Sequence, residues 1–191
     1  MPQSDVFTLD FDALTAPGRV RDIGFLLGPG SGGNALALAN VTAERIAVTS
    51  GPATQANQGV RLLSDAVLRD SSIDVRGEGA RGLVIGSLVE GDYLAEDVTI
   101  TSGGTGVLSG PQPGSNGQLS RVHVTAAASA LQIDRSPLRV ASSLLEGADP
   151  VRVSAMHGDA ALLADHATLA TTGPLGLDVT GANPPRSCAT R

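Results

Sequence analysis

Residues 68–77 read LRDSSIDVRG and residues 94–101 read LAEDVTIT, and the two stretches are copies of one short pattern. Each places apolar residues at alternate positions, which is the period-two signal of a β-strand. The pattern recurs with its first apolar member at Ile46, Ile73, Val98, Val122 and Leu144. These steps of 27, 25, 24 and 22 residues, followed by a less regular sixth copy at residues 167–169, indicate a repeat of about two dozen residues.

Two further series share this drifting period. One consists of short apolar segments, most of them preceded by glycine, at Val60, Leu83, Val107, Leu131, Val151 and Leu177. The other is a single leucine that precedes each copy of the first pattern, at Leu38, Leu68, Leu94, Leu119, Leu138 and Leu163. Three series with one period are harder to obtain by chance than any one of them, so we expect each series to form a row of stacked positions.

The repeats predict a parallel β-helix. Their strand-like pieces are short and are separated by Gly, Ser, Asp and Pro clusters that turn the chain. A single repeat cannot bury its own apolar face, but stacked repeats bury a continuous interior and pair their backbones. The fold class expected is therefore all-β, a single right-handed parallel β-helix of about six to seven coils with roughly 24 residues per coil.

We expect the β-helix domain to span residues 1–180. Three of the four aromatic residues lie within the first 25 positions, so residues 1–19 are predicted to be an N-terminal cap or an irregular first coil. Residues 181–191 are polar and rich in residues that break strands and helices, such as Gly and Pro, which is typical of a flexible tail. A rival interpretation draws residues 35–48 and 160–170 as amphipathic helices of an α/β fold, but two helices do not explain six spaced repeats.

Composition excludes several classes of function. The chain of 191 residues has a net charge of -6 and no Lys, which argues against a general nucleic-acid binder. No apolar run approaches the ~20 residues of a membrane-spanning helix, so no membrane insertion is expected. The single Cys188 cannot form an internal disulfide. Residues 1–5 lack the basic and apolar regions of a signal peptide, which does not exclude secretion.

With these repeats, residues 68–77 and 94–101 resemble coils of right-handed β-helix proteins of the pectate-lyase-like superfamily, and residues 20–25 resemble an earlier coil. The resemblance covers about residues 20–180 and is specific for the fold. It implies an extracellular or cell-surface location and, more loosely, carbohydrate. The superfamily includes polysaccharide lyases, glycoside hydrolases, phage tailspikes and surface adhesins, so the resemblance leaves the activity open.

A lyase of this type would be expected to bind calcium through several convergent oxygens. The best acidic cluster spans residues 90–97, and its candidate metal ligands are Asp92, Glu96 and Asp97. No other cofactor is expected. The alternative interpretation is a solvated acidic turn, because runs of charge are usually solvated and no standard calcium spacing is present.

A candidate acid/base pair is formed by Asp74 and His123, which are expected to lie two coils apart on one outward row with Thr99 between them. Thr99 and Tyr93 are the candidate ligand contacts, although one aromatic residue beyond the first coils cannot form a sugar-stacking platform. The alternative for His123 is an ordinary polar residue on a strand surface.

A second cluster combines His157, Asp159, Asp165 and His166, and either a metal site or two surface turns would explain it. The glycine-rich residues 28–33 lack the Lys of a phosphate-binding loop and indicate a plain loop. The function expected is a secreted or surface scaffold without its own catalytic site, contacting a polysaccharide or a protein partner. The alternatives are a polysaccharide lyase or glycoside hydrolase, or a fragment of one, and an oligomeric adhesin with a stable trimer.

Overall fold

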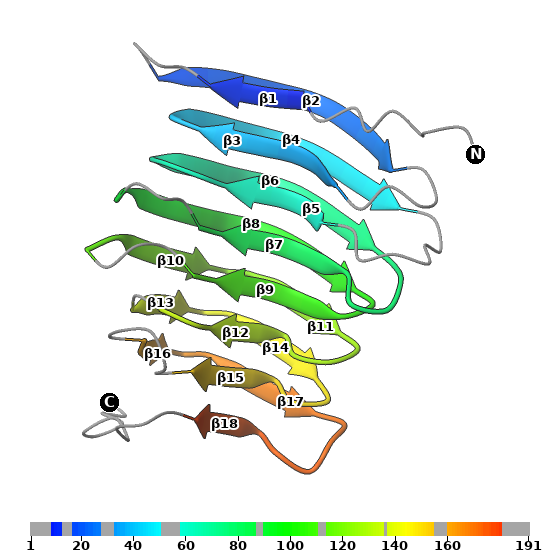
Figure 1. Cartoon of the computed structure of the whole chain (residues 1–191), viewed down its shortest axis with the longest axis vertical. Coiled ribbons are helices and arrows are strands. Elements are labelled where there is room, and N and C mark those ends of the chain that lie inside the picture. Colours follow the sequence, from blue (N-terminus) through cyan, green and yellow to red (C-terminus); the bar gives the residue numbers. More distant parts are fainter. Residues whose placement is uncertain are drawn as a thin grey trace.

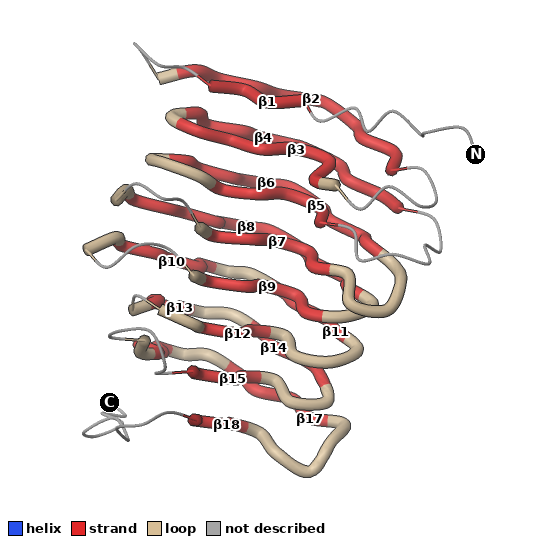
Figure 2. The backbone as a smooth tube through the Cα atoms, viewed as in Figure 1, coloured by secondary structure: helices blue, strands red, loops and turns tan. Residues whose placement is uncertain are grey.

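The computed structural model describes residues 9–12, 17–27, 33–50, 58–86, 90–110, 114–135, 137–154 and 160–180. Within these residues the chain forms strands and turns and contains no helix (Figure 2). The strands stack in parallel as a solenoid of about six turns, each of about 24 residues. The predicted all-β parallel fold is therefore confirmed, and the helical alternative is wrong because residues 35–48 and 160–170 form strands instead.

Each turn of the solenoid contributes to two sheets. The first sheet consists of eight parallel strands, in the order β1 (Leu9–Asp12), β3 (Asn34–Ala39), β5 (Gln58–Leu62), β7 (Arg81–Ile85), β9 (Thr105–Ser109), β12 (Leu131–Ile133), β15 (Val151–Ser154) and β18 (Leu177–Thr180). In Figure 1 these strands run to the left, the strands behind them run to the right, and the chain descends with each turn, so the coil is right-handed.

The second sheet begins with four long strands: β2 (Gly18–Leu27), β4 (Val41–Ser50), β6 (Ala66–Val75) and β8 (Asp92–Ser102). In later turns each long strand is replaced by two short ones: β10 (Asn116–Ser120) with β11 (His123–Ala126), β13 (Leu138–Ala141) with β14 (Leu144–Gly147), and β16 (Leu162–Asp165) with β17 (Thr168–Thr171). The second sheet thus has two faces, one before and one after a bend at the middle of each strand.

One residue per turn produces this bend by adopting a left-handed backbone conformation. In β6 it is Asp70, with φ of 47°, and Ala66 and Leu68 point inward before it, whereas Ser71 and Ile73 point inward after it. The left-handed residue therefore shifts the inward positions by one residue. The corresponding residues in the other turns are Asp22, Arg45, Asp97, Arg121, Ser142 and His166, with φ between 49° and 58°. We call this row the corner row.

The second predicted series is confirmed residue by residue, because Val60, Leu83, Val107, Leu131, Val151 and Leu177 occupy one stacked row of the first sheet. The first series is partly out of register: Ile73 aligns with Val48, and Leu144 points outward beside His123 while Leu145 points inward. The third series is wrong as a single row. Leu68 and Leu119 share an inward row, whereas Leu94 and Leu163 share an outward one, because the distance between the leucine and the bend differs among turns.

The core consists of these inward rows. Leu36, Leu68, Leu83, Ile100 and Leu131 are among its fully buried members. Burying an aliphatic side chain of this size stabilises the fold by about 1.5–3 kcal/mol. Because each row repeats from turn to turn, the apolar interior is continuous along the solenoid axis.

The expected N-terminal cap at residues 1–19 lies mostly outside the described residues, and the expected tail at residues 181–191 lies wholly outside them. The described part of the start places β1 and β2 in register with the following turn, through pairing with β3 and β4. The domain limits stay predictions.

Candidate functional site

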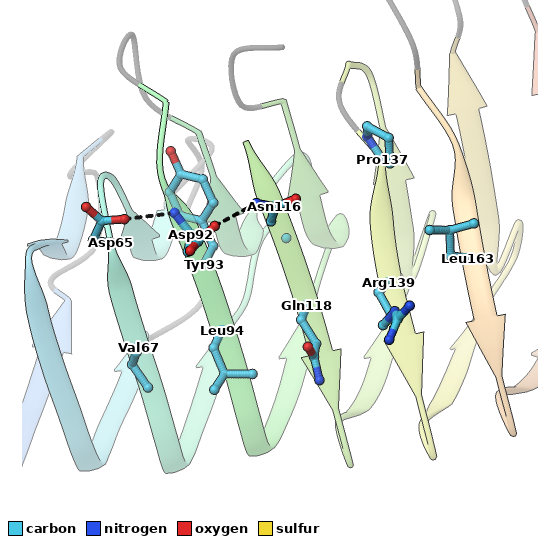
Figure 3. Close-up of a pocket in the computed structure, with 11 residues that line it drawn as sticks. Asp65, Val67, Asp92, Tyr93, Leu94, Asn116, Gln118, Pro137, Arg139 and Leu163 are labelled. Carbon is cyan, nitrogen blue, oxygen red and sulfur yellow. Dashed lines mark hydrogen bonds between the residues drawn. The ribbon is translucent and has the colours of Figure 1, made fainter. Parts of the chain in front are cut away.

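A groove of about 710 Å³ runs along the solenoid on the outer face before the bend (Figure 3). Its floor is an outward row with one residue from each of five successive turns: Val67, Leu94, Gln118, Arg139 and Leu163. The strand register fixes this row, because each member lies directly beside the next on the neighbouring strand. Along one line, the groove therefore presents two apolar side chains, an amide, a guanidinium and a further apolar side chain.

One edge of the groove is a hydrogen-bonded ladder of short polar side chains. The backbone N–H of Asp92 donates to Asp65 Oδ1 at 2.9 Å, and Asn116 Nδ2 donates to Asp92 Oδ1 at 2.8 Å (Figure 3). Asp65 has a left-handed backbone, with φ of 44°, which Asp tolerates better than most residues. The ladder leaves further carboxylate and amide lone pairs at the edge of the groove for hydroxyl donors.

Tyr93, one of the two predicted ligand contacts, lies inside the coil. Its side chain is 2% exposed, and its ring contributes to the groove only from the core side. Burial raises the pKa of its hydroxyl, and a hydrogen bond to Ser115 partly offsets this increase. The neighbours of Tyr93 in its row are Ala66 and Gly117, whose small side chains leave room for a ring in a narrow coil. Its assignment as a ligand contact stays a prediction.

The predicted metal ligands do not gather around one point. Asp92 belongs to the ladder described above, whereas Glu96 and Asp97 lie at the corner and are bound by arginines. Arg121 Nε lies 2.7 Å from Asp97 Oδ1, and Arg121 Nη2 lies 2.7 Å from Glu96 Oε1. Among the described residues, no group of three or more His, Cys, Asp or Glu side chains is placed to hold a metal ion. The acidic residues at the corner are neutralised within the chain.

The ion pairs at the corner continue along the solenoid. Arg45 donates to both oxygens of Asp22, at 2.6 and 2.8 Å, and Arg19 Nη2 lies 2.6 Å from Glu44 Oε1. The hydrogen bond from Arg45 lowers the pKa of Asp22, and the hydrogen bond from Arg121 lowers that of Asp97. At this corner, arginines thus pair with carboxylates on the neighbouring turn at several turns of the solenoid.

These ion pairs predict an acid-dependent loss of stability. Because the folded-state pKa values of Asp22 and Asp97 lie below the usual values near 4, their contribution is fully present above about pH 5 and is lost as the pH falls through the folded pKa values. We expect Arg121→Gln to lower the melting temperature at neutral pH by about 1–3 °C and to reduce the loss on acidification.

The measurement is the melting temperature by circular dichroism between about pH 2 and pH 7. Arg135→Gln is the matched control, because no carboxylate of the described chain lies within ion-pair distance of Arg135. Identical pH profiles for the two variants would show that the corner ion pairs do not contribute to stability.

The predicted acid/base pair is separated on the face after the bend. His123 lies beside Thr99, as predicted, but Asp74 lies beside Thr101, so it belongs to the neighbouring outward row. Asp74 and His123 are two turns apart, roughly 10 Å along the axis, and are offset by two positions along the strand. The prediction that they share one row is wrong, again because of the register.

Each member of the pair has its own partner. His123 Nε2 lies 2.8 Å from Glu146 Oε2, and Thr125 Oγ1 donates to the same oxygen at 3.1 Å. These two hydrogen bonds lower the pKa of Glu146. Asp74 Oδ2 lies 2.9 Å from Arg76 Nη2. The catalytic role of Asp74 and His123 and the ligand role of Thr99 remain predictions, with no convergence of the two catalytic candidates to support them.

The arginines of the described chain fall into two groups. One group forms ion pairs with carboxylates and consists of Arg19, Arg21, Arg45, Arg69, Arg76, Arg121 and Arg152. The other group, for which the described residues supply no such carboxylate, is Arg61, Arg81, Arg135 and Arg139. The chain has a net charge of -6, and the arginines of its described part that lack a carboxylate all line grooves.

Arg139 lies in the groove described above, and the other three line a second groove of about 390 Å³ on the first sheet. The Nε atom of Arg61 is buried and has no hydrogen-bond partner in the described part of the chain. The second groove is therefore the more cationic of the two, with Asp134 as its acidic member.

Several predicted candidates fall outside the described residues, namely His157, Asp159, Cys188 and residues 28–32. From the cluster of His157, Asp159, Asp165 and His166, the last two are described: His166 Nδ1 lies 2.7 Å from Asp165 Oδ1 in the last turn, and both side chains are exposed. Gln118, Arg139 and Glu146 were not among the predicted candidates. Their outward positions follow from the bend, and no single residue type marks the bend because the corner row contains Asp, Arg, Ser and His.

The fold defines the class of protein as a parallel β-solenoid, with grooves on its lateral faces. No protein-family model, no curated protein and no solved structure matches the chain. Within the described residues, no helix is long and apolar enough to cross a membrane.

Proposed function

We propose that this protein is a non-catalytic binding scaffold that acts outside the cell and holds a polysaccharide along the groove before the bend. The observation that carries the proposal is the row Val67, Leu94, Gln118, Arg139 and Leu163, which crosses five successive turns as one continuous surface. Resemblance of the repeats to the pectate-lyase-like superfamily supports carbohydrate as the ligand class.

The dimensions of the groove suit an extended polymer. Five turns span four strand spacings, roughly 19 Å, so a linear chain parallel to the solenoid axis would meet a new side chain about every 4.8 Å. Val67 and Leu94 offer apolar contact to the faces of sugar rings, while Gln118 and Asn116 offer amides to hydroxyl groups. Without a stacking aromatic ring, affinity would come from many modest contacts, which favours a polymer over a single sugar.

The charges in the groove indicate the kind of polysaccharide. Arg139 has no carboxylate partner within the described residues and lies in line with Gln118, so it is free to bind a carboxylate on the polymer. Because its planar guanidinium matches a carboxylate in a bidentate manner, a uronate-bearing chain is the preferred ligand. The ladder of Asp65, Asp92 and Asn116 would accept hydroxyl hydrogens at the other side of the same chain.

The test measures binding of the full chain to a panel of neutral and uronate-bearing polysaccharides by calorimetry, and monitors cleavage in the same samples. We expect Arg139→Ala and Gln118→Ala each to weaken binding of a uronate polymer by about three- to tenfold, because each removes one polar contact. Arg139→Ala should also reduce the salt dependence of binding.

Arg81→Ala is the matched control, because Arg81 lies in the second groove and is likewise without a carboxylate partner in the described residues. Absence of binding to the whole panel would refute the proposal. Binding that is lost in Arg81→Ala and retained in Arg139→Ala would place the ligand in the other groove. Release of new chain ends would identify an enzyme instead of a scaffold.

A further inference from the structure

The second groove lies on the outer face of the first sheet, away from the groove proposed to hold a polysaccharide. Its centre is built on strands: Arg61 of β5, Val84 of β7 and Leu108 of β9 lie side by side in one outward row. Arg81, at the start of β7, pairs with Gln58 of β5, and both line the same groove. The strand register therefore places Arg61 and Arg81 on neighbouring strands of one face.

These two arginines have no counter-charge in the part of the chain that the structure describes. No carboxylate there lies within ion-pair distance of Arg61 or Arg81. The Nε atoms of Arg61 and Arg69 are both buried, but that of Arg69 lies 2.9 Å from Glu96 Oε2. Arg61 Nε thus remains an unsatisfied buried donor, which is costly. An anion that draws the guanidinium into the groove would supply the missing acceptor.

The charge of the groove indicates the kind of anion. Three arginines line it, namely Arg61, Arg81 and Arg135, against the single carboxylate of Asp134, so two positive charges are in excess. Gln132 Nε2 already donates to Asp134 Oδ1 at 3.0 Å. A phosphate monoester carries about 1.5 to 2 negative charges at neutral pH and has three acceptor oxygens for guanidinium groups. A carboxylate or a sulfate ester carries one negative charge, so the phosphate monoester matches the excess better.

The size and the apolar part of the groove indicate what the phosphate is attached to. The volume of about 390 Å³ lies near the lower end of the range for small-molecule sites, which is about 300–1,000 Å³. Leu108 is partly exposed and, with Val84, supplies apolar surface between Arg61 and the far end of the groove at Asp134. A small organic molecule fits this surface better than a polymer does.

We propose that the second groove binds a small organic phosphate monoester. Arg61 and Arg81 hold the phosphate group, and the organic part lies against Val84 and Leu108. This function is separate from polysaccharide binding, because the two grooves lie on different sheets of the solenoid.

The experiment is calorimetric titration of the full chain with phenyl phosphate, inorganic phosphate and phenyl sulfate, in a buffer free of other phosphate and sulfate. We expect phenyl phosphate to bind at least threefold more tightly than inorganic phosphate, because only the ester contacts the apolar surface. It should bind phenyl sulfate at least threefold more weakly than phenyl phosphate, because the sulfate ester has one charge fewer. Arg61→Gln and Arg81→Gln should each weaken phenyl phosphate binding about tenfold, since each removes a charge and its donors.

Arg76→Gln is the matched control. It removes the same charge from the face after the bend, where Arg76 pairs with Asp74, and it should leave phenyl phosphate binding unchanged. Melting temperatures check that each variant is folded. Arg81 is exposed, so Arg81→Gln keeps the test decisive even if the partly buried Arg61 proves necessary for folding.

Any of four results would overturn the proposal. Phenyl phosphate that does not saturate the protein at millimolar concentration would show that the groove is not a phosphate site. Equal weakening by Arg76→Gln and Arg81→Gln would reveal a general effect of charge. Phenyl sulfate that binds as tightly as phenyl phosphate would remove the preference for two charges. Inorganic phosphate that binds as tightly would remove the role of the organic part.

Discussion

Replacing Tyr93 by alanine is expected to destabilise the protein by about 3–5 kcal/mol, the range measured when a buried aromatic side chain is truncated to alanine. Tyr93 is the largest of the fully buried side chains and is 2% exposed. Its row neighbours Ala66 and Gly117 cannot fill the space that the ring would leave, because one carries a single methyl group and the other no side chain. A cavity is therefore expected to remain.

The measurement is chemical denaturation followed by far-ultraviolet circular dichroism. Leu94→Ala is the matched control, since Leu94 is the next residue but points outward into the groove, and it should cost much less. Tyr93→Phe should cost only about 0.5–1.5 kcal/mol, because it removes the hydroxyl and its hydrogen bond to Ser115 while keeping the ring. Similar losses for Tyr93→Ala and Leu94→Ala would contradict the inward position of the ring.

Replacing Gly106 by alanine is expected to cost about 1–3 kcal/mol, the usual effect of overpacking a filled interior. An added Cβ at this position would lie 2.2 Å from Val124 Cγ1 and 2.7 Å from the carbonyl oxygen of Ala130. Gly59 and Gly82 occupy the same row and face Ile73 and Ile100 at similarly short distances. The glycines at the second position of β5, β7 and β9 are therefore explained by side chains that cross the interior from the second sheet.

Gly110→Ala is the control for this substitution, because nothing lies within 4 Å of a Cβ built at Gly110. Alanine there should change the free energy of unfolding by less than about 0.5 kcal/mol. The measurement is the free energy of unfolding of both variants, taken from chemical denaturation curves. If Gly106→Ala were as stable as Gly110→Ala, the interior between the two sheets would be less tightly filled than the structure indicates.

Most of the fold could be predicted from the sequence, because a solenoid repeats its local pattern at every turn. The second series, from Val60 to Leu177, was predicted in its observed register. That success has a physical reason: the strands of the first sheet are short, and each is entered through a glycine or another small residue that marks the same place in each turn. Parallel strands follow from the repeat of about two dozen residues, and a right-handed coil follows from the chirality of crossover connections.

The candidate site was much less predictable. Whether Leu94 points inward with Leu68 or outward with Val67 depends on one backbone conformation, the left-handed residue at the bend. Propensity does not identify that residue, since the corner row contains Asp, Arg, Ser and His. Asp74 and His123 both face outward, but Asp74 lies two positions further along its strand from the bend, so residues that were assigned to one row belong to two neighbouring outward rows.

By itself, the sequence determined the architecture of this protein: an all-β parallel coil of about 24 residues per turn, with an aliphatic interior that requires few aromatic rings. The tertiary structure decided which polar residues face one another. Ion pairs such as Arg121 with Asp97, and the groove row that ends at Leu163, join residues at least one turn apart. The local sequence pattern determines the strands and the length of each turn. The contacts between turns depend on the register of neighbouring strands, which the bend in each strand controls.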